Sequence, residues 1–94
     1  MARKNELRKQ AQGRECTIRI FTVCNGNPET SVLCHLSGGG IGYKVDDRHA
    51  AIGCSSCHDE VDRKTQKIPK IEADLAMYEA VIRTQSIWIS EGLM

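Results

Sequence analysis

The sequence predicts a small α+β domain that is held together by a bound metal ion. Its 94 residues include five cysteines, and two of them, Cys54 and Cys57, have the spacing of a metal-binding pair. Strand-like runs occupy much of the first half and helical patterns the second. A chain of this length buries a modest fraction of its surface and usually needs a metal or a disulfide for stability. We therefore expect one domain over residues 1–94.

The first half predicts a short helix, two strands and a loop. Helical spacing over residues 5–12 ends at Gly13, a residue type that commonly follows a helix. Residues 16–23 and 31–36 are strand-like, because apolar and β-branched side chains dominate both runs. An Asn-Gly-Asn-Pro turn at residues 25–28 separates them, and the glycines at residues 38–40 indicate a flexible loop. Two strands are thus expected before the glycine-rich loop.

The second half is predicted to be mostly helical. Residues 50–53 lead into the cysteine pair, from which a helix runs towards residue 69. A second helix over residues 72–90 repeats apolar side chains at Leu75, Tyr78, Ile82 and Ile89, with Ile71 and Trp88 beside this stripe. We expect the stripe to close the core. The alternative is that it binds a partner or pairs two copies of the chain as a homodimer.

Cysteine spacing indicates a structural zinc site. Cys54 and Cys57 form a Cys-x-x-Cys pair, and Cys16 and Cys24 supply two further thiolates upstream. Zinc in a structural site takes four such ligands in a tetrahedron at about 2.3 Å. An alternative set contains His58 in place of Cys16 or Cys24. The odd number of cysteines and the lack of an apolar segment after the first residue disfavour a secreted disulfide framework and favour the reducing cytoplasm.

Hydropathy disfavours a membrane partner, and the distribution of charge favours a polyanionic one. No apolar run approaches the roughly 20 residues of a membrane-spanning helix, so a membrane partner is not expected. The net charge is +1, yet the beginning of the chain is locally basic. It carries Arg3, Lys4, Arg8, Lys9, Arg14 and Arg19 against Glu6 and Glu15. This excess favours a polyanionic partner, although a solvated helix surface would have the same composition.

The order of histidines and cysteines resembles that of the HNH, or His-Me finger, nucleases. A strand ends near His35, a glycine-rich loop and His49 follow, and a Cys-x-x-Cys-His run at residues 54–58 opens a helix. The resemblance implies a zinc-stapled ββα-metal fold. It implies that His35 is the general base, that His58 binds a catalytic divalent cation such as Mg²⁺ or Mn²⁺, and that His49 occupies the position of the family's central asparagine. An imidazole suits the base role because its unperturbed pKa is about 6.5.

Three segments resemble, more narrowly, the short YbcO-type nucleases of phages and prophages. They are residues 14–16, 23–33 and 57–60, and the likeness extends from Arg14 to Thr65 and more weakly to Trp88. It implies an endonuclease that hydrolyses phosphodiester bonds in DNA, in phage recombination or DNA processing within the bacterial cytoplasm. The cations that could hold flanking phosphates are Arg48, Arg63, Lys64 and Lys67.

Two positions depart from the His-Me finger pattern. Cys34 stands where many of these enzymes carry an acidic metal ligand, and a thiol suits zinc better than magnesium. Asp46 or Asp47 could restore a carboxylate ligand. His49 replaces the asparagine, and an imidazole there would orient His35 or bind metal. These departures keep open the alternative of a noncatalytic zinc-binding module that holds nucleic acid or a protein partner.

Overall fold

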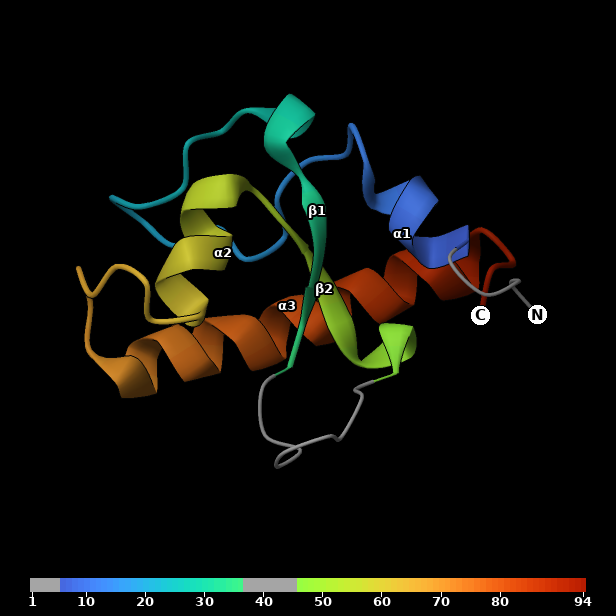
Figure 1. The fold of residues 1–94 in the computed structure, drawn as a ribbon. Coiled ribbons are helices and arrows are strands. Elements are labelled where there is room, and N and C mark those ends of the chain that lie inside the picture. The colour runs from blue at the N-terminus through green and yellow to red at the C-terminus, as the bar shows by residue number, and fades with distance from the viewer. Residues whose placement is uncertain (1–5, 37–45) are drawn as a thin grey trace.

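A two-stranded antiparallel hairpin lies at the centre of the fold, and a long helix runs behind it (Figure 1). The computed structural model describes residues 6–36 and 46–94. Within them the elements are, in chain order, α1 (Glu6–Ala11), η1 (Pro28–Thr30), β1 (Val32–His35), η2 (Asp47–His49), β2 (Ala50–Gly53), α2 (Ser55–Val61) and α3 (Lys70–Ser90). The α+β class is confirmed. The glycine-rich loop predicted at residues 38–40 lies outside the described residues.

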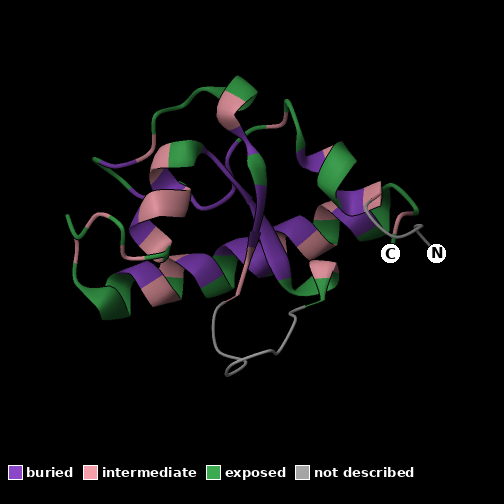
Figure 2. Cartoon of the chain, in the orientation of Figure 1, coloured by how far each residue is buried: buried purple, intermediate pink, exposed green. Residues whose placement is uncertain are grey.

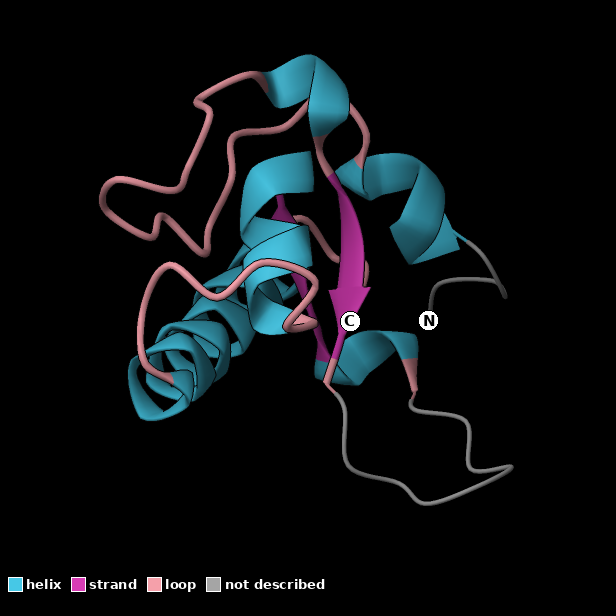
Figure 3. Ribbon diagram, turned by 60° about the vertical axis from the view of Figure 1, so that its left-hand side comes forward, coloured by secondary structure: helices cyan, strands magenta, loops and turns pink. Residues whose placement is uncertain are grey.

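Strand β2 is the more enclosed strand of the hairpin, with all four residues buried. The register pairs Val32 with Gly53, Leu33 with Ile52, Cys34 with Ala51 and His35 with Ala50. Figure 3 shows β1 in front of β2. The other edge of β2 is also occupied, because the Ile52 N–H donates to Thr84 Oγ1 at 3.0 Å and its carbonyl accepts from the Thr17 N–H at 2.7 Å. The backbone N–H and carbonyl of Ile52, which would otherwise be unpaired at this edge, are thereby hydrogen-bonded.

Residues 16–23 do not form the predicted strand. Arg19 and Thr22 have positive φ angles of 53° and 72°, which a strand excludes. The chain turns back on itself instead, and the turns pack against the end of β2. Gly53 permits this contact, because a β-carbon at that position would lie 2.5 Å from Ile18 Cδ1. One strand, and not two, therefore precedes the glycine-rich segment in the part of the chain that the structure describes.

Helix α2 follows β2 directly and is shorter than predicted. It ends at Val61 rather than near residue 69, and Arg63 has a positive φ of 64° that a helix interior excludes. The buried Glu60 carboxylate fixes the turn that follows, because it accepts from the Thr65 hydroxyl at 2.6 Å and from the Ile68 N–H at 3.0 Å. The hydrogen bond from Thr65 is the main cause of a lowered pKa of Glu60.

Two clusters of buried side chains form the core, and both include residues of the hairpin. Figure 2 marks the buried residues of the chain in purple. The first comprises Cys16, Ile18, Ile20, Val23, Cys34, Ala51, Cys54, Cys57, Met77, Ala80 and Val81. The second comprises Leu7, Ala11, Leu33, Ala50, Ile52 and Trp88, and it joins α1 to the end of α3. Arg14 strengthens this junction, since its guanidinium lies 5.1 Å from the centroid of the Trp88 ring and pairs with Glu91 at 2.6 Å.

Helix α3 confirms the predicted final helix, but it buries a different face. Its buried side chains are Ala73, Met77, Ala80, Val81, Thr84 and Trp88. The stripe predicted to close the core is instead exposed, at 60% for Leu75, 55% for Tyr78, 65% for Ile82 and 62% for Ile89. Of the two residues predicted beside it, Ile71 is 79% exposed and Trp88 is fully buried. In residues 6–36 and 46–94, neither α3 nor any other helix is long and apolar enough to cross a membrane.

Candidate metal centre and active site

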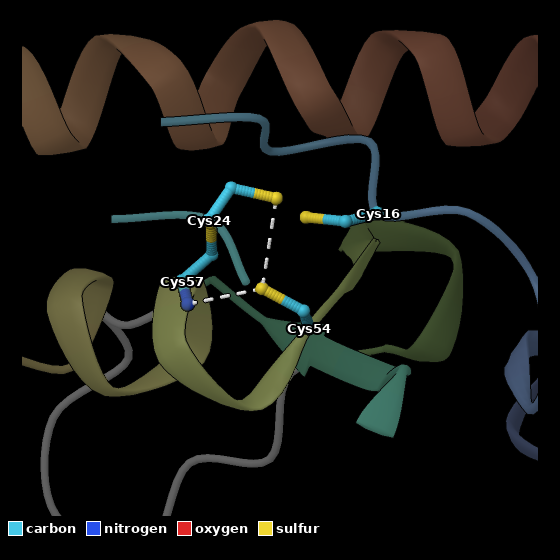
Figure 4. Close-up of side chains that lie close together, drawn as sticks. All are labelled: Cys16, Cys24, Cys54 and Cys57. Atoms are coloured by element: carbon cyan, nitrogen blue, oxygen red, sulfur yellow. Dashed lines mark hydrogen bonds between the residues drawn. The ribbon is translucent and has the colours of Figure 1, made fainter. Parts of the chain in front are cut away.

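Four cysteine side chains converge where α2 meets the turns of residues 16–24 (Figure 4). The sulfur atoms of Cys16, Cys24, Cys54 and Cys57 all lie within 4.8 Å of one another, and those of Cys24 and Cys54 are 3.8 Å apart. Four sulfurs at about 2.3 Å from a zinc ion have edges of about 3.8 Å in a regular tetrahedron. The four cysteines could therefore bind a metal such as zinc. His58, the alternative fourth ligand, is not part of this group.

Local hydrogen bonds orient these thiols. Cys54 is the N-cap of α2, and its sulfur accepts from the Cys57 N–H at 3.4 Å. Cys16 Sγ likewise accepts from a backbone N–H at 3.4 Å. Asn25 ties the preceding turn to α2, because its side-chain amide donates to Ser55 Oγ at 3.1 Å. Such N–H donors hold ligand sulfurs in place and stabilise their negative charge.

Hydrogen bonding and burial shift the pKa values of thiols in and beside this group. Hydrogen bonding with the Cys57 thiol lowers the pKa of Cys16 to about 4, and the same interaction raises the pKa of Cys57. Burial raises the pKa of Cys24. Because the thiolate is the form that binds a metal, metal binding releases the remaining protons of the group. Cys34 stands outside the group, and burial raises its pKa to about 12, so it packs as a small apolar side chain.

His35 and Asp47 form a close pair at the other end of the hairpin. His35 ends β1, and its Nε2 lies 2.6 Å from Oδ1 of Asp47, a residue of η2. The same carboxylate accepts from Arg8 Nε at 3.3 Å. Burial raises the pKa of Asp47, but the hydrogen bonds from His35 and Arg8 outweigh that effect, and the pKa is lowered. The ionised carboxylate can therefore hold one imidazole nitrogen and leave the other as a proton acceptor.

An open pocket adjoins this pair. His35, Asp62, Lys70, Asp74 and Tyr78 contribute to its lining, from β1, the end of α2 and α3. Its volume is about 70 Å³, several times the roughly 10–15 Å³ that one water molecule requires. Charges of both signs meet there, since Lys70 Nζ lies 2.6 Å from the Asp74 carboxylate. The pocket can admit a hydrated cation or a phosphate group.

His58 and Asp62 lie on one face of α2, as their spacing predicts. His58 Nε2 is 3.0 Å from Asp62 Oδ2, and both side chains are about one-third exposed. Because Asp62 lines the pocket, the pair could offer an imidazole and a carboxylate to a cation there. In the described part of the chain, no third His, Cys, Asp or Glu completes a ligand group with them. Magnesium commonly takes one or two protein carboxylates and keeps several waters, so the Asp62 carboxylate suits such an ion, whereas the imidazole of His58 is a ligand type more typical of zinc, nickel or copper.

Neither His49 nor Asp46 contacts the His35 imidazole through a hydrogen bond or ion pair in the described residues. His49 ends η2 with an exposed side chain, and in residues 6–36 and 46–94 its imidazole makes no hydrogen bond or ion pair, although its carbonyl accepts from the Leu36 N–H at 3.2 Å. Asp46 caps η2 and pairs with Arg48 at 2.7 Å. Asp47, which the sequence offered with Asp46 as a metal ligand, is instead the carboxylate that meets His35.

Sequence reasoning missed three residues of the pocket lining. Lys70, Asp74 and Tyr78 follow one another at intervals of four residues on α3, which places them on one helix face. The four-residue interval alone predicts that these three side chains lie on one face of the helix. The expectation that Tyr78 faces the core obscured this signal.

The cations predicted to hold phosphates fall into two groups. Arg63 donates to a backbone carbonyl at 3.1 Å and Arg48 is paired with a carboxylate, so both are engaged within the chain. Lys64 and Lys67 are exposed on the segment between α2 and α3. In the basic beginning of the chain, Arg8 and Arg14 pair with carboxylates, and Arg3 and Lys4 lie outside the described residues.

Comparison with known proteins gives a consistent set of relatives. A family model described as "Putative nuclease YbcO" matches residues 5–93. Proteins with that description from Escherichia coli K12 and from Enterobacteria phage 82 are each 50% identical over 92 residues, which cover 95% of this chain and 96% of each relative. A solved structure of a "putative bacteriophage protein" from Escherichia coli K-12 is 49% identical, with a TM-score of 0.83, and covers 93% of this chain and 100% of its own.

Proposed function

Because the chain belongs to the YbcO nuclease family, we propose that it is a metal-dependent endonuclease that hydrolyses phosphodiester bonds in DNA. Proteins described as nucleases act on nucleic acid, and the relatives come from a bacterium and a phage. We assign it to phage or prophage recombination or DNA processing, as one domain in the cytoplasm of a bacterial host. The observation that carries the proposal is the His35–Asp47 pair beside an open pocket.

The proposed nuclease is of the HNH, or His-Me finger, type. The order of β1, β2 and α2 supports this type, as do a histidine at the end of β1 and a cysteine pair at the start of α2. In this proposal a zinc ion bound by Cys16, Cys24, Cys54 and Cys57 fixes the turns of residues 16–24 to α2. A closed four-thiolate site supplies folding free energy and leaves no position for a substrate.

His35 is the proposed general base. Its Nε2 is held by Asp47, which leaves Nδ1 to accept a proton from the attacking water. In this proposal Asp47 takes the orienting role that was one of two predicted for His49, the other being metal binding. His49 keeps a place in the proposed catalytic site because it is exposed on η2, two residues after Asp47, where it can meet the DNA backbone.

His58 and Asp62 are the proposed ligands of the catalytic cation, Mg²⁺ or Mn²⁺. Such an ion, when bound, neutralises the charge that develops on the phosphate and on the leaving oxygen. Asp62 brings its carboxylate to the pocket and orients the imidazole of His58. Exposed Lys64 and Lys67 are suited to hold flanking phosphates, which gives affinity with little sequence preference.

The test is cleavage of supercoiled and branched DNA by purified protein, with Mg²⁺, Mn²⁺, Ni²⁺ or Zn²⁺ added in turn and His35→Ala as the control. We expect cleavage that requires an added divalent cation and is lost in the variant. The zinc content of each sample is measured in parallel, so that an inactive result cannot come from an unfolded protein.

The second candidate is a noncatalytic zinc-binding module for nucleic acid or a protein partner. Four cysteines gather into one group of metal ligands, whereas in the described residues His58 and Asp62 form only a pair of ligands beside the pocket. This contrast favours the second candidate. This candidate replaces the first if protein that carries one zinc per chain binds DNA but cleaves none with any of the four metals.

A further inference from the structure

Helix α3 gives the pocket beside His35 three polar side chains that have no role in the proposed reaction. They are Lys70, Asp74 and Tyr78. In the part of the chain that the structure describes, Lys70 is the one lysine or arginine of the pocket lining. Lys64 and Lys67, the proposed contacts of flanking phosphates, do not line it. The ammonium group of Lys70 is therefore the cationic side chain closest to the proposed chemistry.

The ion pair between Lys70 and Asp74 contributes little to the helix itself. Lys70 Nζ lies 2.6 Å from Asp74 Oδ2, but the lysine side chain is 71% exposed, and exposed pairs of this kind are weak. The order of the two charges is also the less favourable one, because the cation precedes the anion. Lys70 is the first residue of α3, where the helix dipole disfavours a positive charge. Helix stability thus does not explain a lysine at this position.

The beginning of α3 is fixed to α2 two residues before Lys70. The Ile68 N–H donates to the buried Glu60 carboxylate at 3.0 Å. The Arg63 guanidinium donates to the Ile68 carbonyl at 3.1 Å. The first turns of α3 pass below α2 in Figure 1, and the two helices are in contact. The backbone of Lys70 is therefore held beside α2, while its exposed side chain can reach a ligand in the pocket.

We propose that Lys70 binds the scissile phosphate, which makes it a further catalytic residue of this nuclease. The assignment rests on the proposed function, because it requires a DNA phosphate to enter the pocket. An ammonium group has three N–H donors, and Asp74 accepts one of them. The other two can donate to the non-bridging oxygens of the phosphate. Asp74 is a positioning residue, since it acts by holding the ammonium group at the pocket.

The charges of the pocket support this role. With neutral imidazoles, the carboxylates of Asp62 and Asp74 outnumber the single ammonium group of Lys70 by one. When His58 and Asp62 hold a divalent cation, the balance becomes one positive charge, which one phosphodiester neutralises. Without Lys70, the pocket would have no positive charge to offset the substrate. Because negative charge develops on the phosphate as water adds to phosphorus, a positioned cation stabilises the transition state more than the bound substrate.

The first test is single-turnover cleavage of DNA with Mg²⁺ or Mn²⁺. Lys70→Met should lower the rate at saturating protein about 100-fold, because one contact to the developing charge is lost. Lys70→Arg keeps the charge and should stay within about fivefold of wild type. The matched comparison is Lys67→Met, which removes an exposed lysine outside the pocket and should act mainly on the protein concentration that gives half the maximal rate.

The two proposals can fail separately in this assay. Folding of each variant is checked by circular dichroism and zinc content. If wild-type protein cleaves, His35→Ala does not, and Lys70→Met cleaves at the wild-type rate, the assignment of Lys70 is overturned while the proposed function stands.

A double variant tests the positioning role of Asp74. Asp74→Asn should lower the saturated rate about tenfold, because the ammonium group is no longer held in place. Added to Lys70→Met, the same change should cause no further loss, since no ammonium group is left to position. Losses that multiply in the double variant would show that Asp74 acts without Lys70 and would overturn its positioning role.

Binding of inorganic phosphate gives a readout that needs no cleavage. Amide signals of isotope-labelled protein are followed by NMR as phosphate is added in the presence of Mg²⁺. Signals of His35 and Tyr78 should shift saturably in wild type, and Lys70→Met should bind phosphate at least about tenfold more weakly. Equal binding by both proteins would overturn the assignment. If wild-type protein cleaves no DNA, the proposed function and the catalytic role of Lys70 both fail, and phosphate binding that depends on Lys70 would support only the contact.

Discussion

Helix α2 contributes to two chemical sites of opposite kinds. On one side, Cys54 and Cys57 are fully buried and join two further thiols, with all four sulfurs within 4.8 Å of one another. On the other, His58 and Asp62 are about one-third exposed, and Asp62 lines a pocket that also contains His35. The first site is closed and uniform in its donors, whereas the second is open and mixed.

The difference separates a site suited to stabilising the fold from a site that is open to water and substrate. A closed metal site contributes to folding because all its ligand positions are filled by protein, and a site that performs a reaction must leave positions for water and substrate. Here one turn of helix separates Cys54 from His58, so a metal at the first site would fix the position of the second. Variants at the two sites should therefore fail in different ways.

Cys57→Ser should have the largest effect on the free energy of unfolding. Structural zinc in small domains is worth about 10–16 kcal/mol in apparent binding free energy, and removal of one buried thiolate forfeits much of it. We expect zinc content to fall towards zero and cooperative thermal unfolding to disappear, measured by elemental analysis and calorimetry. Retention of both would contradict a structural metal centre at the cysteines.

His35→Ala should have the largest effect on activity with little effect on the fold. Loss of a positioned general base costs about 10²- to 10⁴-fold in rate. The side chain is partly exposed, so we expect a change of under about 1 kcal/mol in the free energy of unfolding and no change in zinc content. The measurements are single-turnover DNA cleavage and urea unfolding. A loss of stability as large as that of Cys57→Ser would show that the two sites are not separate.

Asp47→Asn and His49→Ala together test which residue orients His35. Asp47 contacts the imidazole at 2.6 Å, whereas His49 has no polar contact with it in the described residues. We expect Asp47→Asn to lower the cleavage rate about 10- to 100-fold, and His49→Ala to lower it less. A larger loss in His49→Ala would return the orienting role to His49.

Cys34→Ala should have the smallest effect. Cys34 is buried beside the cysteine group but is not part of it, and its raised pKa disfavours the thiolate that a metal requires. We expect one zinc ion per chain, unchanged cleavage and a loss of about 1 kcal/mol in the free energy of unfolding from the lost sulfur contacts. A fall in zinc content would mean that Cys34 is a ligand.

Local patterns predicted much of the fold, and the errors have identifiable causes. The hairpin strand at residues 32–35 and the final helix follow from short-range patterns. Residues 16–23 imitate a strand because Ile18 and Ile20 alternate with the polar Thr17 and Arg19 in the sequence. The positive φ angles of Arg19 and Thr22 belong instead to the turns that bring the cysteines together. Nothing in a single sequence encodes such angles at non-glycine residues.

The face of α3 was predicted wrongly because the helix has two apolar sides. Isoleucine and leucine on the outer side give a stronger hydrophobic signal than the alanines and threonine on the inner side. The inner side is nevertheless buried, because Met77, Ala80 and Val81 cluster with Ala51 of β2, and Trp88 clusters with Ala50 and Ile52. Which side faces the core depends on this tertiary fit and not on the period of the helix.

The site was predictable to the extent that its members are close in sequence or chemically distinctive. The four cysteines and the His58–Asp62 pair follow from spacing alone. Contact between His35 and Asp47 was not predicted, because it depends on how β1 and η2 meet in space, and the sequence offered Asp46 or Asp47 only as a metal ligand. The α3 residues of the pocket were missed because they follow from the orientation of that helix.

The most direct test of the two-site account is to measure zinc content and DNA cleavage together during chelation. Protein is treated with EDTA for increasing times, and each sample is divided between elemental analysis and a cleavage assay with and without added Mg²⁺ or Mn²⁺. The account predicts that cleavage stops while one zinc ion per chain is still bound, and that Mg²⁺ or Mn²⁺ alone restores it. Loss of activity and of zinc in step, with no rescue by Mg²⁺ or Mn²⁺, would contradict the account.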